Sequence, residues 1–112
     1  MKILIADDSK KIRELIKSLL SNLGHSIYEC ENGEKAVELF SLYHPDLVLM
    51  DISMPKMNGL EASEQILKEN LRAKILIVTL YNKPSLINEA KRIGTVGYIL
   101  KDDLTKVLEY VD

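Results

Sequence analysis

Hydrophobic residues follow two alternating spacings along the chain. Short, nearly continuous apolar runs are typical of strands that are buried on both faces of a parallel sheet. Such runs occur at residues 2–6, 25–31, 47–50, 74–80 and 97–101. Between them, apolar side chains recur every three or four residues, which is typical of amphipathic helices. The helical stretches are residues 9–24, 32–43, 60–70, 84–94 and 102–111.

Proline and glycine mark the ends of several of these segments. Gly24 and Gly94 are expected to end the first and fourth helices, because glycine readily adopts the left-handed backbone that follows a last helical turn. Pro84 suits the first turn of a helix. Residues 25–31 are the least apolar of the predicted strands, so this strand is expected near an edge of the sheet. The core-facing side of the last helix is expected to carry Leu104, Val107, Leu108 and Val111.

The regular alternation of strands and helices predicts an α/β fold. Strand–helix units with short loops and no linker favour a single domain over residues 1–112, in which helices cover both faces of a doubly wound parallel sheet. The length of 112 residues is close to the commonest domain size. Ligands of such folds bind beyond the carboxyl ends of the strands. Residues at these strand ends are therefore the first candidates for chemistry.

Composition excludes several functional classes. Hydrophobic residues make up 46% and charged residues 29% of the chain, and the net charge of −2 offers no basic excess for direct binding to nucleic acid. No apolar run approaches the roughly 18 residues of a membrane span, and the start of the chain does not read as a signal peptide. Cys30 is the single cysteine, so no intramolecular disulfide can form. We expect a cytoplasmic protein without membrane contact.

Polar side chains stand at the ends of four of the five predicted strands. Asp7 and Asp8 follow the first strand, and Asp51 follows the third. Thr79 lies near the end of the fourth strand and Lys101 ends the fifth. If the first and third strands are neighbours, three carboxylates converge, and a divalent cation is the simplest way to offset their repulsion. Oxygen ligands that are few in number, with room left for water, suit Mg²⁺.

A carboxylate beside such a cation can accept a phosphoryl group and form an aspartyl phosphate. The phosphoryl oxygens carry negative charge, so the site also needs cations and hydrogen-bond donors. Lys101 would supply a charged ammonium group and Thr79 a hydroxyl. The sequence therefore predicts Mg²⁺-dependent phosphoryl transfer to Asp51.

From end to end, the chain resembles the receiver domains of bacterial two-component response regulators, a flavodoxin-like family that includes the chemotaxis regulator. The resemblance rests on four segments in order, with 22 residues from Thr79 to Lys101. These segments are IADDS, LMDISMPKMNG, the VT that ends the fourth strand, and GYILK. The resemblance implies a five-stranded sheet of order 2-1-3-4-5. It also implies that Tyr98, three residues before the lysine, is the family's switch aromatic.

The same resemblance assigns roles to the residues at the strand ends. Asp51 is the phosphoacceptor, and Asp7, Asp8, Asp51 and the backbone carbonyl of Ser53 hold Mg²⁺. Thr79 and Lys101 contact the phosphoryl oxygens. A sensor histidine kinase or a histidine phosphotransfer domain supplies the phosphoryl group, and phosphorylation remodels a face that binds a partner. The domain is not an enzyme in the metabolic sense, because it catalyses only its own phosphorylation and dephosphorylation.

Two uses of such a domain stay open at this point. The chain could act alone, by binding a target protein or by relaying the phosphoryl group. Alternatively, it is the receiver half of a DNA-binding transcription regulator whose output domain is missing from these residues; the Lys101-Asp102 ending resembles the receivers of such regulators.

The chain departs from the commonest family pattern at three places. Asp102 stands where many receivers have proline, so we expect a trans peptide bond after Lys101. Leu80 replaces the usual alanine or glycine and is expected to narrow access to the site. Ser53 and Tyr81 occupy the two positions that tune hydrolysis in the family, and neither is acidic or an amide. Our hypothesis is a long-lived aspartyl phosphate, because Tyr81 can screen the attacking water.

Simpler interpretations and rival functions remain. Asp7 and Asp8 could merely stabilise the positive end of a helix dipole, and Thr79 or Tyr98 could be ordinary strand residues. A Mg²⁺-dependent phosphohydrolase also uses a nucleophilic aspartate, but it usually needs a second carboxylate two residues later, where this chain has Ser53. A scaffold that is never phosphorylated is the third alternative.

Overall fold

The computed structural model describes residues 1–111 and contains a single five-stranded sheet. All neighbouring strands are parallel, and their order is β2-β1-β3-β4-β5. The strands are β1 (Lys2–Ala6), β2 (Ser26–Cys30), β3 (Leu47–Met50), β4 (Ile75–Thr79) and β5 (Gly97–Leu100). This arrangement confirms the predicted flavodoxin-like order, including the edge position of β2, whose side chains are the most exposed of the five strands.

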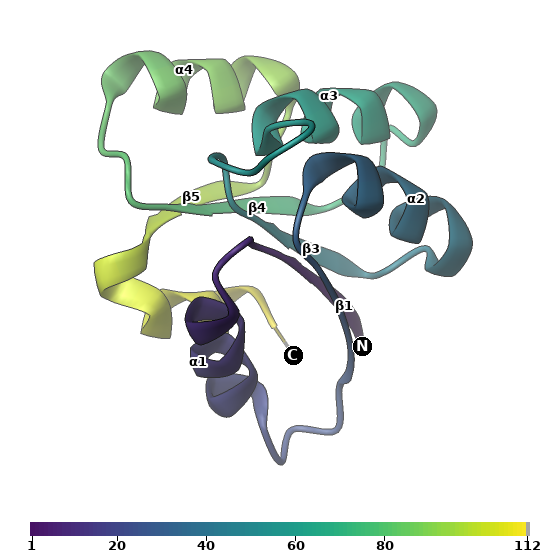
Figure 1. The fold of residues 1–112 in the computed structure, drawn as a ribbon, viewed down its shortest axis with the longest axis vertical. Helices are drawn as coiled ribbons and strands as arrows, with labels where there is room; N and C mark the ends of the chain where they lie inside the picture. Colours follow the sequence, from purple (N-terminus) through teal and green to yellow (C-terminus); the bar gives the residue numbers. More distant parts are fainter. Residues whose placement is uncertain (112) are drawn as a thin grey trace.

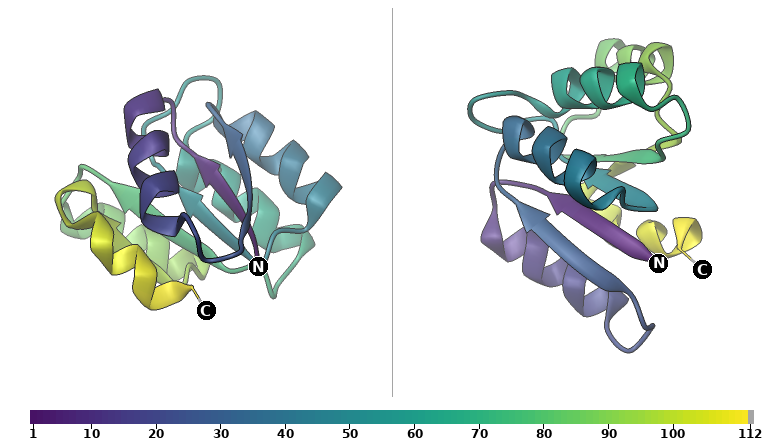
Figure 2. Two further views of the ribbon diagram at one scale, coloured as in Figure 1. Left: turned by 90° about the horizontal axis from the view of Figure 1, so that it is seen from below. Right: turned by 90° about the vertical axis from the view of Figure 1, so that its right-hand side faces the viewer.

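Helices cover both faces of the sheet, as predicted (Figure 1). They are α1 (Lys10–Leu20), α2 (Gly33–Tyr43), α3 (Gly59–Glu69), α4 (Pro84–Ile93) and the 3₁₀ helix η1 (Lys101–Tyr110). Helices α2, α3 and α4 lie on one face, and α1 and η1 lie side by side on the other (Figure 2). Among residues 1–111, no helix combines the length and apolar character needed to cross a bilayer.

The two layers of helices bury two separate apolar clusters against the sheet. One cluster joins strand residues such as Leu4 and Val48 to Phe40 and Ile66 of the α2–α4 layer. The other joins Ile5 and its neighbours to α1 and η1. Because β1, β3 and β4 lie inside the sheet, their residues are buried on both faces, which explains their continuous apolar sequence. These strands give the chemistry at their ends a rigid support.

The first helix is shorter than its hydrophobic spacing predicts. It ends at Leu20, and not near Gly24, because the backbone N–H and the hydroxyl of Ser21 both donate to the carbonyl of Ser18. Asn22 then takes a left-handed backbone with a φ of 65°. Leu23, which the spacing placed on the helix, lies in the following turn with 49% of its surface exposed.

The last helix differs from the prediction in type and in its buried face. It is a 3₁₀ helix with a kink at Asp103 rather than an α-helix. A 3₁₀ helix has three residues per turn, so Leu104 and Val107 share one face and Leu108 is turned away from it. Val107 is completely buried, whereas Leu108, which we expected to face the core, is 40% exposed.

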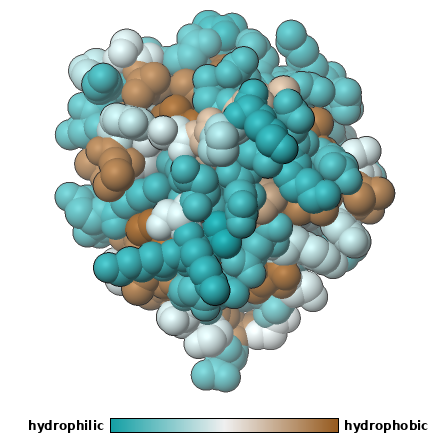
Figure 3. Space-filling view, in the orientation of Figure 1, coloured by the Kyte–Doolittle hydropathy of each residue, from teal (hydrophilic) through white to brown (hydrophobic). Residues whose placement is uncertain are grey.

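The exposed surface carries scattered apolar side chains. The face seen in Figure 3 is mainly hydrophilic, with hydrophobic residues in separate patches. Such scattering is ordinary for a folded domain. The peptide bonds of residues 1–111 are all trans, so the bond between Lys101 and Asp102 has the predicted form.

Candidate functional site

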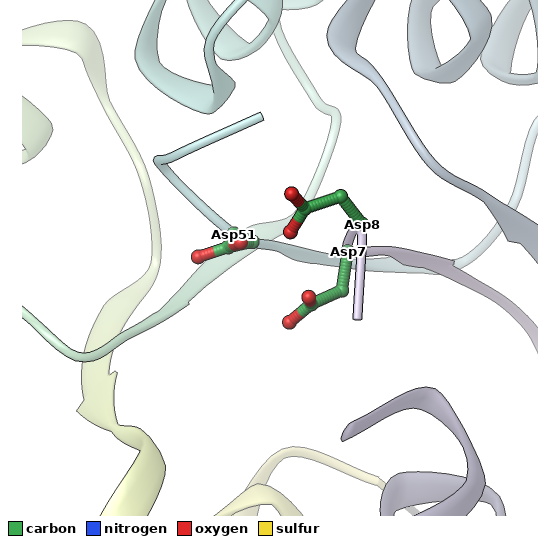
Figure 4. Close-up of side chains that lie close together, drawn as sticks. All are labelled: Asp7, Asp8 and Asp51. Atoms are coloured by element: carbon green, nitrogen blue, oxygen red, sulfur yellow. The ribbon is translucent and has the colours of Figure 1, made fainter. Parts of the chain in front are cut away.

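The ends of β1 and β3 bring three aspartates together. The two strands are neighbours in the sheet, with Ala6 opposite Met50, so the residues that follow them are adjacent. Carboxylate oxygens of Asp7, Asp8 and Asp51 all lie within 4.8 Å of one another (Figure 4). Asp7 and Asp51 are almost fully buried, at 2% and 3% exposed, while Asp8 faces solvent. The structure thus brings together the three carboxylates that the sequence singled out.

Backbone hydrogen bonds hold these aspartates beyond the ends of the strands. The Asp7 N–H donates to the carbonyl of Cys30 at 3.1 Å, and the Asp51 N–H donates to the carbonyl of Ala6 at 2.9 Å. The Ser9 N–H donates to Asp7 Oδ1 at 2.9 Å, and the Ser9 hydroxyl caps the first turn of α1. The backbone that carries these carboxylates is therefore held by the neighbouring strands, and beyond Asp7 by the first turn of α1.

Lys101 supplies the positive charge of the site. Its ammonium nitrogen lies 2.8 Å from Asp7 Oδ2 and 3.3 Å from Asp51 Oδ1, and only 7% of its side chain is exposed. Burial lowers the pKa of this lysine, but its hydrogen bond to Asp7 and the charge of Asp51 outweigh that effect, and the net pKa is raised. Lys101 is therefore a permanent cation in contact with two of the three aspartates.

Asp51 is a carboxyl group whose charge is poorly compensated. Burial and the nearby charge of Asp7 raise the pKa of Asp51 to about 6, against the opposing effect of Lys101. The three aspartates can carry a charge of −3 and Lys101 offsets one unit, so a divalent cation would neutralise the remaining charge. The donor set consists of oxygens only, which is the ligand chemistry of Mg²⁺. The residues present therefore fit this ion.

A cavity of about 260 Å³ opens onto Asp51. Its walls are formed by Asp8, Ser9, Ile12, Asp51, Ser53, Leu80, Tyr81 and Lys101. Leu80 is 74% exposed and Tyr81 38% exposed, so these two side chains form the outer part of the wall. Leu80 thus stands at the mouth of the cavity, and its effect on access to the site stays a prediction.

Thr79 and Tyr98 lie next to this cavity without lining it. Thr79 is fully buried at the end of β4, and its hydroxyl oxygen accepts the N–H of Tyr81 at 3.2 Å. The Tyr98 hydroxyl donates to the carbonyl of Tyr81 at 2.6 Å. Both residues are thus connected to the cavity through Tyr81.

The loop after Asp51 returns tightly to the end of β3. The Gly59 N–H donates to the carbonyl of Ile52 at 2.8 Å, and a Cβ atom at Gly59 would overlap the carbonyl oxygen of Asp51. Asn58 and Glu61 form a reciprocal capping box that begins α3 immediately after this contact. Glycine at position 59 therefore permits a loop that holds the backbone of Asp51 closely.

Arg13 is a buried charged residue that the strand-end reasoning missed. It is 8% exposed, and its guanidinium donates to the backbone carbonyl of Asp7 and to the carboxylate of Glu29 on β2. The signal in the sequence was the spacing: Arg13, Ile16 and Leu20 occupy one face of α1, so an arginine stands where an apolar residue is expected.

Comparison with known proteins assigns the family. The family model described as response regulator receiver domain matches residues 3–112. The chemotaxis protein CheY of Thermotoga maritima is 35% identical over 89% of this chain and 84% of its own length. The chain belongs to the response regulator receiver domain family.

Longer relatives and solved structures agree with this assignment. The transcriptional regulatory protein YdfI of Bacillus subtilis is 44% identical over 96% of this chain. The chain spans about half the length of YdfI and of the DegU protein of Brevibacillus brevis. The CheX–CheY–BeF₃–Mg²⁺ complex from Borrelia burgdorferi contains a chain that matches with a TM-score of 0.92 and 28% identity, over 99% of this chain and 86% of that one.

Proposed function

We propose that residues 1–112 act as one receiver domain whose Asp51 accepts a phosphoryl group in a Mg²⁺-dependent reaction. The observation that carries this proposal is the burial of Asp51 against two further aspartates and Lys101, at the end of the central strand of the sheet. The phosphoryl donor is the phosphohistidine of a sensor histidine kinase or of a histidine phosphotransfer domain. The cytoplasm is the proposed location, where the buried thiol of Cys30 stays reduced.

Transfer needs an ionised Asp51. The pKa of about 6 leaves most of this carboxyl group ionised at neutral pH. A carboxylate oxygen forms a bond to phosphorus while the P–N bond to histidine breaks, and the imidazole keeps the electron pair of that bond. Asp7, Asp8, Asp51 and the backbone carbonyl of Ser53 would hold Mg²⁺, which supplies positive charge for the phosphoryl oxygens. Lys101 would contact the same oxygens, and its distance of 3.3 Å from Asp51 Oδ1 supports this role.

Phosphorylation would act on the rest of the domain through Thr79. If the Thr79 hydroxyl turns towards the phosphoryl group, it loses the hydrogen bond that it now accepts from the Tyr81 N–H. Tyr81 also holds the Tyr98 hydroxyl through its carbonyl, so a shift of Tyr81 changes the surroundings of Tyr98. The surface formed by α4, β5 and η1 would then present a different shape to a partner.

Two uses of this switch are supported by different relatives. Coverage of most of CheY from Thermotoga maritima supports a domain that binds a target protein on its own. The 44% identity with the transcriptional regulator YdfI supports the receiver part of a DNA-binding regulator. The length of the gene's full reading frame distinguishes the two uses, because only the DNA-binding regulator requires an output domain.

The test of the proposal is phosphorylation by acetyl phosphate, read from the intact mass of the protein. We expect the wild type to gain one phosphoryl group only when Mg²⁺ is present, and Asp51→Asn to gain none. Asp46→Asn is the matched control, because Asp46 is an exposed aspartate at the opposite end of the sheet and should leave the gain intact. A wild type that gains no mass with Mg²⁺, or a modified Asp51→Asn, would contradict the proposal. Repeated Asp51-dependent turnover of a phosphate ester would instead favour a phosphohydrolase.

A further inference from the structure

Arg13 is the buried cation that the proposed phosphoryl chemistry does not use. It lies on the inner face of α1, and only 10% of its side chain is exposed. Burying a guanidinium is costly unless its charge is paired and its N–H groups have acceptors. The contacts that offset this cost therefore show what the residue does in the fold.

The guanidinium of Arg13 connects the first aspartate to the edge strand. Its Nη1 donates to the backbone carbonyl of Asp7 at 2.7 Å, and its Nε donates to Glu29 Oε1 at 3.0 Å. Its Nη2 lies 3.8 Å from a carboxylate oxygen of Glu31. The other oxygen of Glu29 accepts a hydrogen bond from Lys17 at 2.9 Å, so the carboxylate that orients Arg13 is itself held.

Every polar group of the Asp7 backbone thus has a partner from another part of the chain. The N–H of Asp7 is bonded to Cys30 of β2, and the carbonyl is bonded to Arg13 of α1. One carboxylate oxygen accepts the Ser9 N–H, which leaves the other for Lys101. Two of these partners are charged side chains, and Arg13 is the one that bonds to the backbone of Asp7, whereas Lys101 pairs with its carboxylate.

We infer that Arg13 is a positioning residue for the cation site, and that Glu29 and Lys17 orient it. Its hydrogen bond fixes the peptide between Asp7 and Asp8, and this peptide sets the spacing of their two carboxylates. Without the guanidinium, the buried Asp7 carbonyl has no other hydrogen-bond donor among residues 1–111, and the peptide between Asp7 and Asp8 is held less firmly. The inference rests on the proposed function only in taking Mg²⁺ as the ion that the aspartates hold.

Electrostatics and positioning predict opposite signs for the loss of Arg13. A charge effect alone would make Mg²⁺ bind more tightly to Arg13→Met, because a positive charge near the carboxylates has been removed. Positioning predicts weaker binding, because the two carboxylates lose their fixed spacing. Methionine keeps much of the apolar stem of arginine, so the packing of α1 changes little.

The experiment is a calorimetric titration of Mg²⁺ into Arg13→Met, Arg13→Lys and the wild type. We expect Arg13→Met to bind about tenfold more weakly, as is typical when a group that orients a metal ligand is lost. Arg13→Lys should recover part of the loss, because one ammonium group can reach the Asp7 carbonyl but cannot also pair with Glu29 in the same way. Arg92→Met removes an arginine that is 60% exposed and paired on the surface of α4, and it should bind Mg²⁺ like the wild type.

Measurements without metal separate this role from general stability. Amide hydrogen exchange in the metal-free protein should be faster at Ser9 in Arg13→Met, while β3 and β4 keep their protection. If Arg13→Met does not fold, Glu29→Gln decides the question, since it keeps the shape of the carboxylate and removes the charge that orients Arg13. We expect Glu29→Gln to bind Mg²⁺ about two- to threefold more weakly.

Unchanged or tighter Mg²⁺ binding by folded Arg13→Met overturns the inference. If Arg13→Met does not fold, unchanged Mg²⁺ binding by Glu29→Gln overturns it. In both cases a wild type that binds Mg²⁺ and is phosphorylated leaves the proposed function standing. A wild type that binds no Mg²⁺ overturns both.

Discussion

The site has two halves that differ in how firmly they are held. The acidic half, formed by Asp7, Asp8 and Asp51 at the ends of β1 and β3, has a buried backbone bonded to neighbouring strands. The switch half consists of Thr79, Leu80, Tyr81 and Tyr98 around the ends of β4 and β5. Its outer residues are exposed, and single hydrogen bonds connect Tyr81 to Thr79 and to Tyr98.

This difference fits the two tasks that the proposed function requires. Phosphoryl transfer requires charged groups that are held in place before the reaction. Signalling requires a segment that moves at low cost, and such segments have few buried contacts. Lys101 connects the halves, because it follows β5 in the chain but contacts the carboxylates beyond β1 and β3.

The largest expected effect follows from removing that connection with Lys101→Met. Two buried carboxylates then lose their cation, which should lower the free energy of unfolding by about 3 kcal/mol at pH 7. The loss should shrink towards pH 4 as the Asp51 carboxyl group, whose pKa is about 6, becomes protonated, and phosphorylation by acetyl phosphate should slow strongly. Urea unfolding over this pH range is the measurement.

The matched control for that variant is Lys106→Met, since the Lys106 side chain is 58% exposed and its one ion pair among residues 1–111 is with Asp103 on η1. Its free energy of unfolding should change by less than about 0.5 kcal/mol. Equal losses in the two variants would show that Lys101 does not hold the halves together.

Asp51→Asn should stabilise the acidic half while abolishing its chemistry. The pKa of Asp51 in the folded protein is about 6, above its ordinary value of 3.8. Between these values the folded state binds more protons than the unfolded state, so the stability of the wild type falls as the pH rises from about 4 to 6. The variant lacks this fall and should be more stable at pH 7 by up to about 3 kcal/mol.

That comparison is made by urea unfolding with a metal chelator at several pH values. The difference between Asp51→Asn and the wild type should be small near pH 4, grow to about pH 6 and then stay constant. Added Mg²⁺ should reduce it, since the cation stabilises the ionised carboxylate. A difference that does not depend on pH would contradict the unfavourable ionisation of Asp51.

The acidic half was more predictable from the sequence than the contacts that support it. Parallel strands end at one edge of the sheet, so Asp51 could be placed beside Asp7 once β1 and β3 were taken as neighbours. Arg13 was missed because its main acceptor is a backbone carbonyl, which every residue carries; its spacing with Ile16 and Leu20 indicates burial but not this partner. The end of α1 at Leu20 was missed for a similar reason, because it depends on hydrogen bonds from Ser21 to a carbonyl. Hydrophobic periodicity also cannot distinguish an α-helix from the kinked 3₁₀ helix that turns Leu108 outward.

Tyr81→Ala tests whether the switch half protects the aspartyl phosphate. Tyr81 lines the cavity over Asp51, so its removal should admit water and speed dephosphorylation by about two- to fivefold, a change of roughly 0.4–1 kcal/mol in the barrier. The rate is followed by intact mass after the phosphodonor is removed. Tyr110→Ala, a tyrosine on η1 that is outside the cavity lining, is the control. An unchanged rate in Tyr81→Ala would end the screening hypothesis.

Tyr98→Phe has the smallest expected effect and tests only the hydrogen bond from the Tyr98 hydroxyl to the Tyr81 carbonyl. It removes the hydroxyl that donates to the Tyr81 carbonyl and keeps the ring in place, so the free energy of unfolding should fall by only about 0.5–1.5 kcal/mol. If this bond keeps Tyr81 over the cavity, the variant should also dephosphorylate faster than the wild type, but less so than Tyr81→Ala. In the double variant Tyr81→Ala/Tyr98→Phe the second substitution should add nothing to the rate, because the side chain that it would release is already absent. Additive rates would mean that Tyr98 acts on the phosphoryl group by a route that does not pass through Tyr81.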